Sequence, residues 1–217
     1  MSGRPKKSVP VRPRQTQAQR RAVALAKISV AGLEILAESG YYSMTFANVA
    51  ERAGVSRGSL MHYFAQKSDL AIAVIEDGMV ALLRELRSKV PGWLANPDRD
   101  GQIFDDIYFG GPLFQAWLAV AVHARTDKQL NENFQRMSAE NINSVCRIAA
   151  DGWGPELMRN PQWPDFLELV QSVIQGFAVA HLDKGWGAPQ GEAWPAARRL
   201  LLIALDDLRA GRPLSGS

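Results

Sequence analysis

Apolar residues recur three and four positions apart along most of this chain, which is the spacing of amphipathic α-helices. Glycine and proline interrupt the pattern, and Ser or Thr precedes several apolar runs, as is common at helix N-termini. In the first part of the chain the pattern predicts helices that start at Thr16, Thr45, Ser56 and Ser68 and end near Gly40, Ala53, Phe64 and Pro91.

The remaining sequence has the same character. Segments near 101–124, 128–150, 164–184 and 193–209 are predicted to be helical, with connectors that contain proline or glycine between them. No stretch shows the persuasive alternation of apolar and polar residues that a half-buried strand requires. The sequence therefore predicts an all-α protein, with an N-terminal three-helix helix-turn-helix bundle and a larger C-terminal helical bundle.

Charge is distributed unevenly between the two parts. Residues 1–67 contain 11 Lys or Arg and 3 Asp or Glu, a net charge of +8, whereas residues 68–217 contain 14 and 19, a net charge of −5. A basic first part favours a polyanionic partner such as nucleic acid. Residues 1–15 also hold several prolines, so they are predicted to form a flexible basic arm.

Cysteine content and hydropathy indicate the cellular setting. Cys146 is the only cysteine, so the chain can form no disulfide within itself and no multi-cysteine metal site. No run approaches the ~18 apolar residues that span a bilayer, and the basic N-terminus is not followed by the apolar stretch of a secretory signal. We therefore expect a cytoplasmic protein without a membrane partner.

The two short helices and the Ala-Gly-Val turn between them have the helix-turn-helix layout, whose second helix enters the major groove of DNA. Leu60 and Phe64, four residues apart, would fix that helix to the bundle. On its outer side, Arg57 could contact guanine or a phosphate, and Gly58 would let the backbone approach the groove closely. Tyr63 suits a phosphate contact.

The segment AESGYYSMTFANVAERAGVSRGSLMHYFAQKSDL resembles the DNA-binding domain of the TetR family of transcriptional regulators, over about residues 20–75. The resemblance implies an all-helical homodimer, usually a repressor, that a small ligand releases from DNA. It divides the chain into a DNA-binding domain at 16–66 and a ligand-binding and dimerisation domain at 67–217. It implies DNA contacts from Thr45, Ser56, Arg57, Gly58, Ser59, His62, Tyr63 and Lys67.

Two features of the basic part fall outside that pattern. Met61 stands where many family members have tyrosine, which favours an apolar contact such as one with a thymine methyl group. The arm sequence GRPKK is similar to peptides that read the minor groove, so Arg4 could enter a narrow A·T groove. The alternative is that the arm contacts phosphates without sequence preference.

The last two predicted helices are apolar on nearly all sides, which indicates burial against more than one neighbour. The resemblance places the dimer on these helices, although both could also be plain core. The predicted interface residues are Phe166, Val170, Val173, Phe177, Leu201, Leu205 and Leu208.

Aromatic residues and one methionine between these regions could line an apolar effector pocket, or could be ordinary core. The candidates are Phe104, Tyr108, Phe114, Trp117, Phe134, Met137 and Phe177. His123 and Asp127, four residues apart, could share a metal in principle, but a surface hydrogen-bonded pair is the better expectation because no further ligand is evident. No metal and no cofactor are predicted.

Together these patterns predict a DNA-binding transcriptional regulator, a repressor that a small apolar or amphipathic effector releases from an inverted-repeat operator. An enzyme is not expected, because the sequence has no Gly-rich phosphate loop and no nucleophile-elbow motif. Two alternatives remain: an architectural protein that binds DNA with little sequence preference, and a TetR-like regulator without a ligand.

Overall fold

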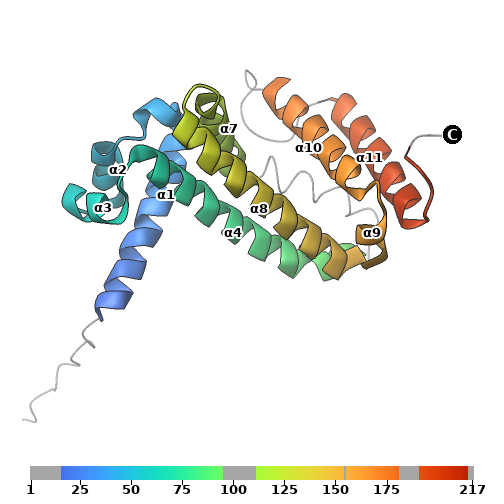
Figure 1. Cartoon of the computed structure of the whole chain (residues 1–217), viewed down its shortest axis with the longest axis horizontal. Coiled ribbons are helices and arrows are strands. Elements are labelled where there is room, and N and C mark those ends of the chain that lie inside the picture. Colours follow the sequence, from blue (N-terminus) through green and yellow to red (C-terminus); the bar gives the residue numbers. More distant parts are fainter. Residues whose placement is uncertain (1–15, 95–110, 154, 181–190, 215–217) are drawn as a thin grey trace, which may run out of the picture.

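The computed structural model describes residues 16–94, 111–153, 155–180 and 191–214, and these form α-helices without a strand (Figure 1). Arg4, Phe104 and Tyr108 lie outside the described residues. The helices are α1 (Gln17–Ser43), α2 (Phe46–Ala53), α3 (Arg57–Tyr63), α4 (Lys67–Leu94), α7 (Leu113–Ala124), α8 (Lys128–Trp153), α9 (Pro155–Arg159), α10 (Trp163–Ala180) and α11 (Ala193–Arg209).

The predicted starts of the first three helices are confirmed, and each has a side-chain cap. The hydroxyl of Thr16 accepts a hydrogen bond from the backbone N–H of Gln19, and the side-chain oxygen of Gln19 accepts one from the Thr16 N–H, which completes a capping box. Thr45 caps α2 and Ser56 caps α3 in the same manner. These caps satisfy N–H groups that have no partner inside the helix.

Two glycines place the turns of the N-terminal bundle. Gly54 follows α2 in the left-handed conformation (φ 64°, ψ 37°), which side chains other than glycine rarely adopt. Gly40 also has a positive φ, 73°, but its ψ is 179°, so it kinks α1 and one more turn follows it, up to Ser43.

Other predicted boundaries also differ from the structure, and α4 begins at Lys67, one residue before the predicted Ser68. Helix α4 continues through Pro91 and Gly92 to Leu94, because a proline removes one helical hydrogen bond and kinks a helix but does not have to end it. The connector predicted between residues 152 and 164 contains the short helix α9, which is too brief to produce a periodic apolar pattern.

Buried apolar residues form two clusters. The larger one joins α1–α4 to α7 and α8, and its members include Leu36, Leu60, Ile75, Val120 and Phe134. The smaller one joins the second half of α4 to α9, α10 and α11. The helix-turn-helix bundle is therefore packed directly on α7 and α8, and no separate core divides it from them.

Glycines also allow α4 to approach its neighbours closely. A Cβ atom added at Gly32 of α1 would lie 2.6 Å from a methyl group of Val74, and one added at Gly78 would lie 2.7 Å from a methyl group of Leu113. At Gly32 a side chain would press on the short, branched side chain of Val74, whereas at Gly78 the flexible end of Leu113 would have to move. Among the described residues, no helix is long and apolar enough to cross a membrane.

Candidate nucleic-acid interface

Helix α3 is fixed by one face and exposed on the other. Leu60 is fully buried, and the half-buried Phe64 packs against the same core. The Ser56 hydroxyl accepts from the Ser59 N–H at 3.1 Å and donates to the Ser59 hydroxyl at 2.9 Å, which orders the first turn. The residues left exposed for a partner are Arg57, Gly58, Ser59, Met61 and His62, and the caps Thr45 and Ser56 are exposed beside them.

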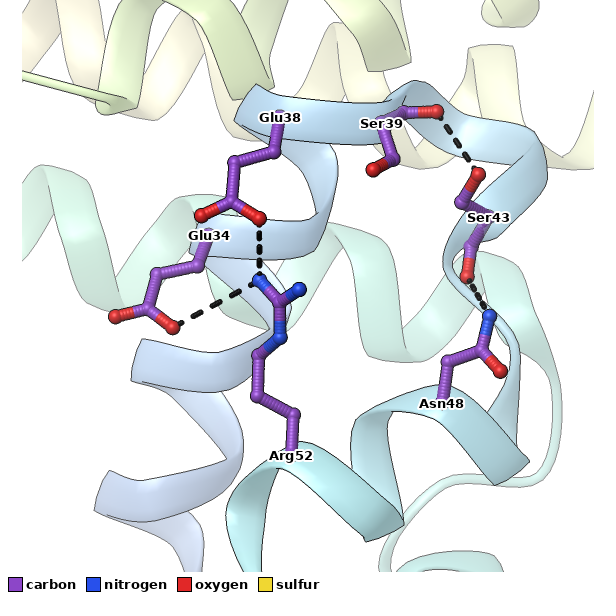
Figure 2. Close-up of polar contacts among 6 residues, drawn as sticks. All are labelled: Glu34, Glu38, Ser39, Ser43, Asn48 and Arg52. Atoms are coloured by element: carbon purple, nitrogen blue, oxygen red, sulfur yellow. Dashed lines mark hydrogen bonds and ion pairs between the residues drawn. The ribbon is translucent and has the colours of Figure 1, made fainter.

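Polar contacts tie α2, which supports α3, to α1 (Figure 2). The Arg52 guanidinium lies 2.7 Å from a carboxylate oxygen of Glu38 and 3.9 Å from one of Glu34. The Asn48 amide donates to the Ser43 carbonyl at 2.7 Å. Exposed ion pairs contribute little stability, so the buried apolar residues that α1 and α2 share supply most of their contact.

Tyr63 lies at the end of α3, where its ring is close to the ring of His62 and to the guanidinium of Arg21. Its ring centroid is 5.7 Å from that of His62, and the Arg21 guanidinium of α1 lies 5.5 Å from it. A cation held over an aromatic ring and facing outward can also contact a phosphate. Sequence reasoning did not assign Arg21 a role, although the Arg20–Arg21 pair at the start of α1 is a signal that could have identified it.

Lys67 begins α4 and is held against the last turn of α1. Its ammonium donates to the Tyr42 carbonyl at 3.2 Å and lies 4.2 Å from the centroid of the Tyr41 ring. Burial lowers the pKa of Lys67 below its ordinary value. Lys67, a predicted DNA contact, is therefore held in position by the last turn of α1.

This arrangement has known counterparts. Residues 28–74 match the family model described as bacterial regulatory proteins, tetR family. The HTH-type transcriptional regulator CymR of Pseudomonas putida is 30% identical over 175 residues, which cover 78% of this chain and 84% of CymR. The chain belongs to the TetR family. It is a TetR-family transcriptional regulator, as the helix-turn-helix resemblance predicted.

Two solved structures have the same fold as this TetR-family regulator. FadR from Bacillus subtilis, in complex with stearoyl-CoA, aligns with a TM-score of 0.57 at 16% identity and covers 83% of this chain and 96% of its own. The multidrug binding protein EbrR, complexed with ethidium, aligns with a TM-score of 0.57 at 17% identity and covers 87% and 99%. At such identities the likeness concerns the fold alone.

The residues predicted for the dimer interface of the TetR-family regulator lie mostly in its own core. Val173 and Phe177 are half-buried, and the other five are at most 7% exposed because α10 and α11 pack on each other and on α9. In the single chain, helices of the same protomer already cover five of the predicted residues: Phe166, Val170, Leu201, Leu205 and Leu208. A dimer on α10 and α11 stays a prediction.

The predicted pocket residues of the TetR-family regulator do not form one group. Phe114 stacks on Trp117 with centroids 5.6 Å apart, and Trp117 lies 5.5 Å from Phe134. Met137 is buried in the same cluster as Phe134. Phe177 instead packs on Trp194 in the other cluster, at 5.3 Å.

The described part of the chain also contains a surface pocket of about 430 Å³ between α9 and the end of α11. None of the predicted pocket residues lines it, and three arginines do, each beside a carboxylate of Glu156, Asp206 or Asp207. No described aromatic residue lines this open depression, unlike the effector site predicted from the sequence.

The side chains of His123 and Asp127 of the TetR-family regulator have separate partners. The His123 Nδ1–H donates to the Ala119 carbonyl at 3.1 Å, and the Asp127 carboxylate accepts from the Leu130 N–H at 2.9 Å. Within the described ranges, no three His, Cys, Asp or Glu residues lie together as metal ligands. The two residues are joined through the backbone, where the Asp127 N–H donates to the His123 carbonyl at 3.3 Å, while their side chains bond to neighbours at the corner between α7 and α8.

Proposed function

We propose that this regulator is a homodimeric repressor that binds an inverted-repeat operator and is released by a small molecule. The observation that carries the proposal is α3, whose Leu60 is fully buried while Arg57 and Ser59 in its first turn are exposed. A helix fixed in this way can present base-reading side chains to the major groove. Because its target is DNA, we expect it to act in the cytoplasm.

The exposed residues of this part divide by chemistry into base readers and phosphate contacts. Arg57 at the start of α3 suits guanine, and Met61, 55% exposed, suits a thymine methyl group. Lys67 and Tyr63, which neighbouring residues hold in place, suit phosphates. Further contacts are proposed from residues that are also exposed: Thr45, Ser56, Gly58, Ser59 and His62.

A second copy of the chain is proposed to pack on the outer faces of α10 and α11. Leu200 is 67% exposed and Ile203 is 58% exposed, one turn apart on α11, and Leu169 and Val179 of α10 are exposed as well. Large apolar side chains grouped on exposed helix faces mark interaction sites. A two-fold dimer would place its recognition helices about 34–36 Å apart, one turn of DNA.

The proposed effector is apolar or amphipathic. The ligands named for the similar folds FadR and EbrR are stearoyl-CoA and ethidium, which both combine a large apolar part with charge. In this chain the contacting rings of Phe114, Trp117 and Phe134 lie on α7 and α8, the helices that pack on the DNA-binding bundle. An effector that binds more tightly to one setting of these helices would shift the DNA-binding equilibrium.

Selection of bound duplexes from a random library, at near-physiological salt, tests the DNA-binding part. We expect enrichment of an inverted repeat. Repeating the selection with Arg57→Ala should relax the preference at one position of each half-site, whereas Lys67→Ala should weaken all sequences alike and flatten the salt dependence. Equal losses on operator and random DNA for Arg57→Ala would exclude a base-reading role for Arg57.

The same selection distinguishes the proposed repressor from the alternative functions. Enrichment of A·T-rich DNA without a repeat would contradict the repressor and support an architectural protein that recognises groove shape. A repressor without a ligand would give the inverted repeat but would keep its operator affinity in a screen of apolar and amphipathic compounds.

A further inference from the structure

Three aromatic rings meet where α7 contacts the end of α1. The His123 ring lies 4.8 Å from the ring of Tyr41, tilted by 33°, and 4.7 Å from the ring of Tyr42, edge-on at 84°. Edge-to-face and offset pairs at this distance are attractive beyond their buried area. The ring of one residue on α7 therefore contacts both residues that follow the Gly40 kink.

The two tyrosines are the same residues that hold Lys67. Its ammonium donates to the Tyr42 carbonyl and lies 4.2 Å from the Tyr41 centroid and 5.9 Å from the Tyr42 centroid. Burial, and then the nearby Asp127 carboxylate, raise the pKa of Tyr41 above its ordinary value. The Tyr41 phenol is thus uncharged at neutral pH, and its attraction to Lys67 is that of a cation to a ring face.

Backbone bonds fix His123 to the corner between α7 and α8. Its Nδ1–H donates to Ala119 one turn earlier, and its carbonyl accepts from the backbone N–H groups of Thr126 at 3.1 Å and Asp127 at 3.3 Å. Asp127 then caps α8 through Leu130. A displacement of this corner would move the imidazole relative to the tyrosines.

We propose that His123 is a positioning residue that holds Lys67 in its phosphate-binding setting through Tyr41 and Tyr42. The chain of contacts is continuous from the α7–α8 corner to Lys67. A shift of α7 therefore changes how firmly Lys67 is held for its contact with a DNA phosphate. The inference rests on the proposed function, because Lys67 is taken there as a phosphate contact. It names the residues that connect the C-terminal helices to that contact.

A double-mutant cycle on non-specific DNA tests the coupling. A random-sequence duplex of about 30 base pairs serves as the probe, with salt varied from about 50 to 200 mM. Affinity falls as salt rises, so a plot of log affinity against log salt has a negative slope. Lys67→Ala should make this slope shallower by about 2 units for a dimer, because each protomer loses one phosphate contact. His123→Ala should weaken binding about 3- to 10-fold and also make the slope shallower. When it is combined with Lys67→Ala, it should weaken binding by less than about 2-fold beyond the effect of Lys67→Ala alone.

Matched variants separate positioning from packing. His123→Phe keeps a ring against both tyrosines and should retain most of the affinity. Val122→Ala, on the neighbouring exposed position of α7, should change neither affinity nor slope. If His123→Ala does not fold, Tyr42→Ala replaces it. The Tyr42 side chain is 80% exposed, and its loss removes the edge-on contact with His123. Losses from His123→Ala and Lys67→Ala that add independently would overturn the proposal.

A second readout does not involve DNA. The rate at which acetic anhydride acetylates Lys67, followed by peptide mass spectrometry, should rise at least about twofold in His123→Ala, because the ammonium loses its fixed partners. It should stay unchanged in Val122→Ala. If the wild-type protein binds no duplex, the proposed function fails; if it binds and Lys67 reacts equally in both variants, only the positioning role of His123 fails.

Discussion

Gly54 and Gly58 are four residues apart and serve different purposes. Gly54 has φ 64°, a conformation that costs other residues about 1–2 kcal/mol, although an added Cβ would meet nothing within 4 Å. Gly58 lies inside α3 with a negative φ, and an added Cβ would also meet nothing there. Gly54 is therefore required by the fold, whereas Gly58 is free to serve the contact with DNA.

Alanine at each position should distinguish these roles. Gly54→Ala should lower the Tm by about 3–6 °C, because the turn must remain left-handed. Gly58→Ala should leave the Tm unchanged or raise it by up to about 3 °C, since alanine favours a helix, yet weaken operator binding at least about threefold. Thermal melts and operator titrations provide the measurements, and full operator affinity in Gly58→Ala would contradict a close approach of this backbone.

At the scale of elements, α4 is the helix that contacts both parts of the molecule. Its first half belongs to the core of α1–α3, α7 and α8, and Leu86 in its second half belongs to the core of α10 and α11. Gly32 and Gly78 let it approach α1 and α7 closely. A rigid helix shared by two cores can transmit a shift from one to the other, provided that it has two settings.

The contact of α4 with α8 contains a carboxyl group in an unfavourable setting. Burial raises the pKa of Glu76, and Glu140 and Asp77 add to the effect while Arg136 opposes it. A raised pKa means that the folded state prefers the protonated acid, so stability is greatest below the ordinary pKa and falls as the pH rises through the raised one. Ionised Glu76 therefore destabilises the fold at neutral pH.

Glu76→Gln should remove this effect. We expect its Tm to exceed that of the wild type by about 1–2 °C at pH 7.5, the small size that solvent screening allows at an exposed site, and the difference to disappear near pH 4. The control Glu132→Gln, on the exposed side of α8, should change little at either pH. A difference between Glu76→Gln and wild type that grows toward acid pH would contradict the assignment.

At the scale of the whole molecule, the proposed inverted-repeat operator would require a dimer with a defined spacing. Two recognition helices reach an inverted repeat only if two copies are joined at a fixed spacing. The exposed apolar residues on α10 and α11 lie far from α3, at the other end of the chain's fold (Figure 1). The proposed dimer would thus hold the DNA-binding bundles without covering them.

Charges placed on the outer face should separate the copies. The double variant Leu200→Glu with Ile203→Glu should run as a monomer in size-exclusion chromatography with light scattering, and its operator affinity should fall by about 10²-fold or more, since avidity is lost. Val80→Glu, an equally exposed apolar position on α4, should remain dimeric. A double variant that stays dimeric would place the interface elsewhere.

The sequence by itself determined the local features of this protein. Thr16, Thr45 and Ser56 cap helices and Gly54 makes the turn because these effects depend on neighbours a few residues away. The same short range allowed the register of the helix-turn-helix, and hence the family, to be predicted. Even there, the end of α4 was misjudged, because a proline within a helix weakens it without fixing where it stops.

Only the tertiary structure decided which faces meet. Helices α10 and α11 are apolar on several sides, so the pattern could not tell core residues such as Leu205 from exposed ones such as Leu200. Likewise, His123 gained its place beside Tyr41 and Tyr42 from residues about eighty positions away in the chain. Periodicity specifies that a helix has an apolar face, but the packing of distant helices selects which neighbour covers it.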